Sequence, residues 1–151
     1  MSHWSLSELL PHAGDMILID AIEACDDKSI RARMKVTPGG LFNLADGSLP
    51  AWVGIELMAQ TVAAFAGIQA KRNGQPVELG FLLGTRKYES TVASLAANQQ
   101  VEIKAACSLQ DETGMGVFEC TLTADPDVQM SARLNVYRPP NVSSYFEEPT
   151  P

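Results

Sequence analysis

The sequence is poor in three kinds of residue that mark common functional classes. Its three cysteines, Cys25, Cys107 and Cys120, are widely spaced and include no CxxC pair, so neither a disulfide framework nor a zinc site is indicated and we expect reduced thiols. Eleven Lys and Arg stand against 18 Asp and Glu, for a net charge of −7, which argues against a nucleic-acid-binding protein. Histidine occurs only as His3 and His12, so the choice of a general base is narrow.

The amino terminus also lacks a cationic segment followed by an apolar run. No signal peptide is therefore predicted, and a cytoplasmic location is the default expectation. With 151 residues and 46% hydrophobic content, the chain fits one globular domain, which we expect to span residues 1–138. Residues 139–151 are rich in proline and have little to bury, so we expect a loosely ordered tail.

The longest apolar stretch is PAWVGIELMAQTVAAFAGIQAKR, residues 50–72, which predicts a helix of about five turns that is apolar almost all round. Glu56 is the only ionisable residue between positions 51 and 70, and an unpaired carboxylate is costly to bury there. The many Ala and Gly residues, together with Glu56 and Gln60, argue against a membrane span. We therefore predict a core helix that a sheet surrounds.

The remaining elements are expected on both sides of this helix. Ser5 and Glu8 have the spacing of a capping box for a short helix that Pro11 ends. Alternating apolar residues and intervening turns predict strands at 16–25, 29–36, 77–89, 100–110, 116–123 and 129–137. The order of elements indicates an α+β fold in which a curved antiparallel sheet encloses one helix.

Four motifs resemble those of a known enzyme family. LPHAGDMILID (residues 10–20) and LPAWVGIELMAQ (49–60) resemble the LPHRxPxLLxD and PGxLxxEAxAQ segments of 3-hydroxyacyl-ACP dehydratases of the FabZ/FabA type. With LGFLLGTRKYE (79–89) and GMGVFEC (114–120), they are most similar to the aryl-polyene-biosynthesis (ApeP-like) dehydratase branch. The resemblance covers about residues 9–137 and implies the hotdog fold, an antiparallel curved sheet wrapped around one long central helix.

The resemblance implies elimination of water from a 3-hydroxyacyl thioester on acyl carrier protein (ACP), giving a trans-2-enoyl thioester in polyene or fatty-acid-like chain assembly. No cofactor or metal is expected for this reaction. Two positions depart from the family pattern. The loop GGLFNLADGSLP, residues 39–50, has no histidine where these enzymes carry a catalytic one, and Ala51 replaces a glycine.

The reaction needs an acid, a base and hydrogen-bond donors for the thioester carbonyl. Desolvation in an apolar helix favours a neutral carboxyl group, so Glu56 is the candidate general acid. Histidine titrates near neutral pH, which makes His12 the candidate base; a carboxylate such as Asp46 or Asp15, or a partner's histidine, is the alternative. The first N–H groups of the helix can stabilise an oxyanion, and these belong to Ala51, Trp52 and Val53.

Each of these side chains also has a structural interpretation. Glu56 could be a buried acid paired with Arg86 or Arg31, and His12 could be a hydrogen-bonded structural group. Gln60, one turn after Glu56, could orient the carboxyl group, contact substrate or satisfy core backbone groups. Gly80, Phe81 and Gly84 are expected to line an acyl tunnel or simply to form a strand.

ACP is acidic, so docking would need positive charge at the tunnel mouth. The candidates, whose alternative role is ordinary solvated charge, are Lys71, Arg72, Arg86, Lys87 and Arg138. The resemblance implies a homodimer, or a heterodimer with a second hotdog dehydratase. Two other functions stay open: a non-catalytic subunit that binds acyl-ACP and supports a catalytic partner, and a hotdog thioesterase.

Overall fold

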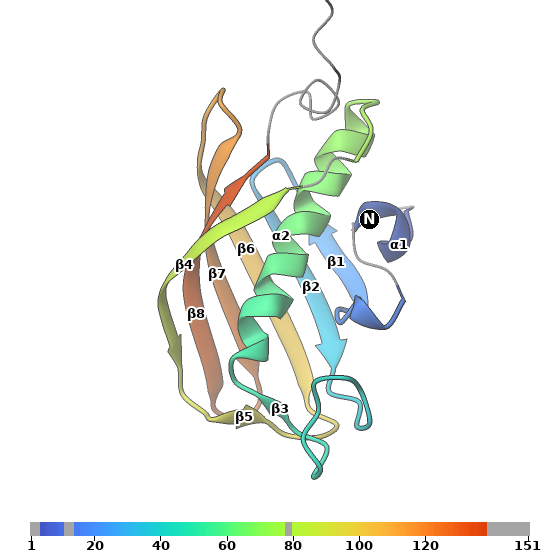
Figure 1. Ribbon diagram of the computed structural model, residues 1–151, viewed down its shortest axis with the longest axis vertical. Helices are drawn as coiled ribbons and strands as arrows, with labels where there is room; N and C mark the ends of the chain where they lie inside the picture. Colours follow the sequence, from blue (N-terminus) through green and yellow to red (C-terminus); the bar gives the residue numbers. More distant parts are fainter. Residues whose placement is uncertain (1–3, 11–13, 78–79, 139–151) are drawn as a thin grey trace, which may run out of the picture.

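The computed structural model describes residues 4–10, 14–77 and 80–138 of the chain (Figure 1). Two helices, α1 (Leu6–Leu9) and α2 (Val53–Arg72), and a 3-10 turn, η1 (Gly14–Met16), are present in these ranges. The strands are β1 (Ala21–Cys25), β2 (Ser29–Lys35), β3 (Leu49–Pro50), β4 (Phe81–Ser90), β5 (Ser94–Leu95), β6 (Gln100–Gln110), β7 (Met115–Ala124) and β8 (Val128–Tyr137). His12 and the tail at 139–151 lie outside the described residues.

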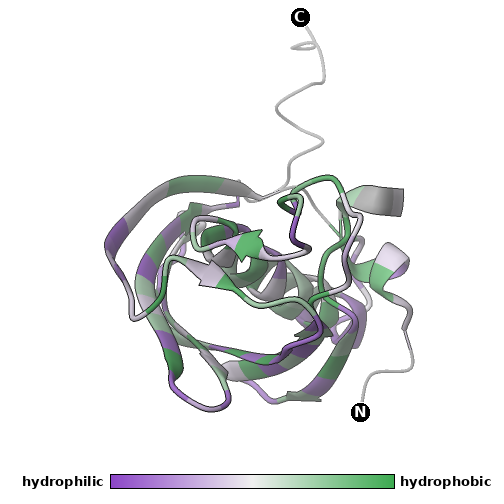
Figure 2. Cartoon of the chain, turned by 90° about the horizontal axis from the view of Figure 1, so that it is seen from below, coloured by the Kyte–Doolittle hydropathy of each residue, from purple (hydrophilic) through white to green (hydrophobic). Residues whose placement is uncertain are grey.

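One antiparallel sheet provides most of the framework. Its six strands follow the order β1-β2-β6-β7-β8-β4, while β3 and β5 form a separate two-stranded pair. The large sheet curves around α2, as the view from below shows (Figure 2). Along β7 the buried and less buried residues alternate, because successive side chains of a strand point to opposite faces. The predicted arrangement of a curved sheet around one long helix is thus observed.

Helix α2 supplies the centre of the core. Val53, Leu57, Met58, Ala64 and Ile68 are all completely buried along it. By length and composition this helix could cross a membrane, but 67% of its most apolar window is buried inside the fold. Burial against the sheet therefore accounts for its apolar character.

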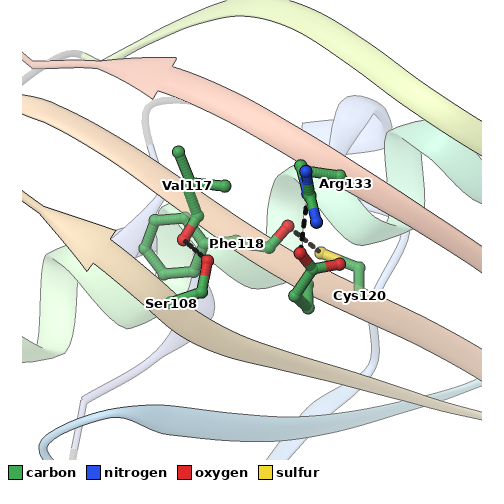
Figure 3. A network of polar contacts seen from close by, with 6 residues as sticks. Ser108, Val117, Phe118, Cys120 and Arg133 are labelled. Atoms are coloured by element: carbon green, nitrogen blue, oxygen red, sulfur yellow. Dashed lines mark hydrogen bonds and ion pairs between the residues drawn. The ribbon is translucent and has the colours of Figure 1, made fainter.

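A group of polar contacts joins strands β6, β7 and β8 (Figure 3). On β7, Glu119 points to the outer face and accepts a hydrogen bond from Arg133 Nε on β8 at 2.7 Å. Its neighbour Cys120 is buried, and burial raises the pKa of the Cys120 thiol to about 12. Near the other end of β7, the exposed Ser108 hydroxyl donates to the Val117 carbonyl at 3.1 Å. The Arg133–Glu119 and Ser108–Val117 contacts therefore lie on the exposed outer face of the sheet.

Element boundaries differ from the sequence prediction mainly at their amino-terminal ends. The long helix begins at Val53 and not at position 50, because Leu49 and Pro50 pair with β5 as strand β3. The first predicted strand begins at Ala21, since η1 precedes it, and the strand predicted from residue 77 begins at Phe81. Strand β6 has the predicted bounds.

The short amino-terminal helix forms, but without the predicted capping box. The Ser5 hydroxyl donates to a Glu8 carboxylate oxygen at 3.2 Å, and no side-chain hydrogen bond caps the backbone of α1. Four residues give this helix little stability of its own. Its buried Leu9, packed against α2, is what holds α1 to the domain.

Candidate active site

The Glu56 carboxyl group lies in the first turn of α2 and is partly buried. Gln60, one turn later and completely buried, donates from Nε2 to Glu56 Oε1 at 3.1 Å. The same nitrogen donates to the Met16 carbonyl at 2.6 Å, and Gln60 Oε1 accepts the Leu18 N–H at 2.8 Å. One amide therefore orients the carboxyl group and fastens the segment that follows η1 to the helix.

Of the three roles considered for Gln60, this geometry excludes contact with the substrate. Complete burial and three hydrogen bonds to the protein leave its amide no exposed surface for a substrate. The orienting and backbone-satisfying roles both apply. Two arginines were considered as structural partners of Glu56. Arg31 pairs with Glu102 instead, with Arg31 Nε 3.8 Å from Glu102 Oε2. Arg86 is an exposed residue of β4.

The start of α2 is built from three segments. The Ala51 N–H donates to the Ala93 carbonyl at 2.9 Å, which extends the pairing of β3 with β5. The Ala51 carbonyl accepts both the Gly54 N–H, at 2.9 Å, and the Tyr88 hydroxyl. Both polar groups of the Ala51 backbone are thus occupied. The expectation that Ala51 donates to a thioester is wrong, because strand pairing already uses its N–H.

Trp52 and Val53 keep their N–H groups available at the amino-terminal end of α2. Within the part of the chain that the structure describes, neither group has a backbone acceptor, as is usual for the first residues of a helix. Both point from the positive end of the helix dipole. The Trp52 N–H can therefore bind an anion or a carbonyl oxygen at the exposed start of the helix, whereas Val53 is completely buried, so a carbonyl oxygen must enter the fold at this point to reach the second donor.

The loop that precedes α2 packs against the first residues of the helix through Phe42. Phe42 and Trp52 meet edge to face with ring centroids 5.9 Å apart, and Trp52 is still 58% exposed. In the same loop, Asp46 accepts hydrogen bonds from the Ser48 hydroxyl and N–H. These bonds lower the pKa of the Asp46 carboxyl, which makes Asp46 a weaker base than an ordinary aspartate.

Tyr88 belongs to this region although sequence reasoning assigned it no role. The motif at 79–89 contains it, but nothing local to β4 indicates that its hydroxyl reaches the start of α2. Gly84 lies further from this end of β4, and Gly80 and Phe81 lie near the strand's beginning. At about 3.3 Å per residue, Phe81 is about 23 Å along the strand from Tyr88. A role in lining an acyl tunnel stays a prediction for these three.

The predicted ACP-docking cations fall into two groups. Lys71 and Arg72 end α2, about 24 Å along the axis from Glu56 at 1.5 Å per residue, and Arg72 donates to the Cys25 carbonyl at 3.1 Å. Arg86 and Lys87 are exposed on β4, beside Tyr88. Arg138 Nη1 lies 3.5 Å from the Ala66 carbonyl. Only Arg86 and Lys87 are thus near the amino-terminal end of α2.

The segments on both sides of residues 11–13 are held against α2. Leu9 packs at Gly67, where an added Cβ would lie 2.5 Å from the Leu9 carbonyl oxygen, and Met16 is bound to Gln60. His12 itself lies outside the described residues, so its catalytic role stays a prediction. Among the residues that the structure does describe, no three His, Cys, Asp or Glu side chains gather as a metal site.

Solved structures with the same fold include both dehydratases and thioesterases. The chain is similar to the dehydratase heterocomplex ApeI:P from Xenorhabdus doucetiae, with a TM-score of 0.85, 27% identity and coverage of 97% of this chain and 100% of that chain. It also resembles the E. coli PaaI protein from the phenylacetic acid degradation operon (TM-score 0.61, 16% identity, coverage 80% and 82%). A hypothetical thioesterase with coenzyme A from Streptococcus pneumoniae is similar as well (TM-score 0.59, 15% identity, coverage 79% and 85%).

The last two similarities, below 25% identity, show the fold alone, and no curated protein matches the chain. The family model of the ApeP dehydratase, by contrast, matches residues 4–147, nearly the whole chain and all four motifs. The curved sheet and the central helix agree with this match. The chain belongs to the ApeP-like family of hotdog-fold dehydratases.

Proposed function

We propose that this dehydratase acts on a 3-hydroxyacyl thioester carried by ACP and forms a trans-2-enoyl thioester during polyene or fatty-acid-like chain assembly. The observation that supports this most directly is the placement of Glu56. Gln60 orients its carboxyl group, and Glu56 follows Val53 by three residues at the amino-terminal end of α2. At 1.5 Å per residue this is about 4.5 Å along the axis, a separation that one small thioester spans.

The elimination divides among these groups as follows. The thioester carbonyl accepts hydrogen bonds from the Trp52 and Val53 N–H groups, which stabilise the negative charge that develops on its oxygen. A base removes the C2 proton, and the electron pair forms the C2=C3 bond as the C3–O bond breaks. Glu56 gives its proton to the departing hydroxyl, which leaves as water. The Gln60 amide, which donates to Glu56 Oε1, orients the carboxyl group for this transfer.

His12 is the base in this proposal. The chain on either side of it is fixed to α2 at Gly67 and Gln60, and Gln60 is one turn from Glu56. Asp46 is less suited, because its hydrogen bonds from Ser48 lower its pKa. Replacing His12 by alanine tests this assignment separately from that of Glu56.

We further propose that the active assembly includes a second hotdog subunit. The related structure from Xenorhabdus doucetiae is named a dehydratase heterocomplex, and the loop before α2 lacks the histidine of ordinary dehydratases. Strand β4 is one edge of the six-stranded sheet, with Leu82 and Leu83 exposed on it, and an unpaired edge can add another chain's strand. A homodimer would use the same edge.

The experiment supplies 3-hydroxyacyl-ACP to the purified chain, alone and with a second hotdog dehydratase subunit, and follows the loss of water by mass spectrometry. Glu56→Gln removes the transferable proton and should reduce the rate about 100- to 10,000-fold. Glu119→Gln is the matched control, since this outer-face carboxylate pairs with Arg133 and should leave the rate unchanged. An unaffected rate in Glu56→Gln would contradict the proposal.

The same experiment distinguishes the two other functions. A non-catalytic subunit, which the missing loop histidine favours, gives no product alone, and Glu56→Gln then leaves the activity of the mixed assembly intact. A thioesterase releases free thiol from acyl thioesters. The similarity to thioesterases is confined to the fold, so release of thiol is not expected.

A further inference from the structure

We propose that Tyr88 is a positioning residue that holds the amino-terminal end of α2, so that the Trp52 and Val53 N–H groups meet the thioester carbonyl. This inference rests on the proposed function. It concerns a residue that the elimination described above does not use. Three independent features of the structure converge on the Tyr88 hydroxyl: its hydrogen bond, the backbone of β4 and a glycine in α2.

The hydrogen bond joins two segments that are distant in the sequence. Tyr88 lies 37 residues after Ala51, whose carbonyl accepts its hydroxyl proton. Met130 Sδ on β8 lies 3.2 Å from Tyr88 Oη. The Ala51 N–H is bound to Ala93, next to β5, so the peptide group on one side of Ala51 is held by the segment before β5 and the other by Tyr88 of β4. The next two residues, Trp52 and Val53, carry the available N–H groups.

The backbone of β4 is distorted where it presents this side chain. Lys87 has φ of 56°, a left-handed conformation that few residues other than glycine adopt and that costs about 1–3 kcal/mol. The register with β8 shifts between Arg86 and Glu89. Both neighbours, Lys87 and Glu89, are exposed, whereas Tyr88 is partly buried. The irregular backbone turns Tyr88 toward the helix.

Because Gly54 has no side chain, the Tyr88 hydroxyl can pack directly against α2. A Cβ at this position would lie 2.8 Å from Tyr88 Oη and 2.7 Å from Met130 Sδ, closer than real contacts allow. A glycine inside a helix costs about 0.5–1 kcal/mol relative to alanine. The left-handed backbone at Lys87 and the glycine at position 54 are both locally unfavourable, and both allow the same Tyr88 contact. Local features that cost stability in this way are characteristic of functional positions.

The chemistry explains why this position needs rigidity. Donors to a developing oxyanion accelerate a reaction only when they are already oriented, since reorienting them during the reaction would cost free energy. Without the Tyr88 bond, the Ala51 carbonyl keeps only the Gly54 N–H of its own helix, and nothing ties this peptide group to β4. Burial raises the pKa of Tyr88, so its hydroxyl keeps the proton that it donates at neutral and mildly alkaline pH.

The test compares Tyr88→Phe with Ser108→Ala in the active assembly. Both variants remove a hydroxyl that donates to a backbone carbonyl, but Ser108 lies on the exposed outer side of the sheet (Figure 3). For Tyr88→Phe we expect kcat to fall about 10- to 100-fold with a much smaller change in KM, because the misplaced donors act mainly on the transition state. Ser108→Ala should change neither constant.

Hydrogen exchange supplies a readout that does not depend on turnover. The amides at the start of α2, from Val53 to Leu57, should exchange faster in Tyr88→Phe and at the wild-type rate in Ser108→Ala. As a second variant, Gly54→Ala should displace Tyr88 Oη and lower kcat, and its effect in the Tyr88→Phe background should be smaller than in the wild type, because one of its two close contacts is then removed.

The outcomes separate this inference from the function on which it rests. An active wild type whose kcat and exchange rates are unchanged by Tyr88→Phe would overturn the inference alone. Equal losses of kcat in Tyr88→Phe and Ser108→Ala would also overturn it, since general destabilisation would then explain both. A wild type that forms no enoyl product, with or without a second subunit, would overturn the proposed function and the inference together.

Discussion

Buried side-chain amides and hydroxyls in this domain bind backbone groups, and Gln60 shows what such a bond maintains. Its amide satisfies the Met16 carbonyl and the Leu18 N–H, more than 40 residues away in the sequence, and also contacts Glu56. A buried backbone group left without a partner costs about 1–3 kcal/mol. Gln60 is therefore as important for the amino-terminal segment as for the carboxyl group.

We expect Gln60→Met to lower the free energy of unfolding by about 2–4 kcal/mol, because it strands two backbone groups at little change in volume. Chemical denaturation measures this loss. The control is Thr61→Val, which also removes a buried hydrogen bond, from Thr61 Oγ1 to the Leu57 carbonyl at 2.8 Å. That carbonyl sits within α2 and retains its helical donor, so the loss should stay below about 1 kcal/mol. Equal losses in both variants would contradict the interpretation.

At the scale of elements, close approach between α1 and α2 depends on a single glycine. An added Cβ at Gly67 would lie 2.5 Å from the Leu9 carbonyl oxygen and 3.1 Å from Leu9 Cα. Both are backbone atoms, which cannot rotate away as the end of a flexible side chain could. Leu9 and Leu10 are buried at 1% and 4% exposure, so any displacement of α1 uncovers apolar surface.

Gly67→Ala should therefore destabilise the domain by about 1–3 kcal/mol, although alanine favours a helix by about 0.5–1 kcal/mol over glycine. Thermal denaturation, together with hydrogen exchange in residues 5–10, should show the loss and its location. Gly84→Ala is the matched control, since a Cβ there meets no atom within 4 Å. A stabilised Gly67→Ala protein would show that α1 does not pack this closely.

At the scale of the whole molecule, the sheet has two edges of different character. Strand β1 has five residues and lies on the side of the domain that carries α1 (Figure 1). Strand β4 has ten residues and exposes Leu83 at 56%. A long edge with exposed leucines is the surface on which we propose that another subunit pairs.

Leu83→Asp should weaken association, with itself or with a second hotdog subunit, at least 10-fold, because it places a charge at the edge of the paired sheets. Sedimentation velocity over a range of concentrations measures the change. Leu109→Asp provides the comparison, since Leu109 is 58% exposed near the hairpin of β6 and β7, with two strands between it and β4. Equal association of both variants would exclude the β4 edge.

The long helix, the longer strands and the family can all be predicted from the sequence. A long apolar helix in which Glu56 is the only ionisable residue before Lys71 predicts a central helix, because removing so much apolar surface from water is favourable. Alternation of apolar and polar residues placed β6 at its observed bounds and β7 and β8 within one residue, because the two-residue period of a strand is a local property. Motif spelling identified the family and Glu56 as its candidate acid.

The way the start of α2 is built becomes evident only in the folded protein. Pro50 signals a first helical turn, yet pairing with β5 holds it in a strand and uses the Ala51 N–H. The contacts of Gln60 with Met16 and of Tyr88 with Ala51 span 44 and 37 residues. No local pattern encodes such contacts, because they arise when the sheet closes around the helix. For that reason the sequence indicated the acid, while the structure revealed what orients it and what holds the neighbouring donors.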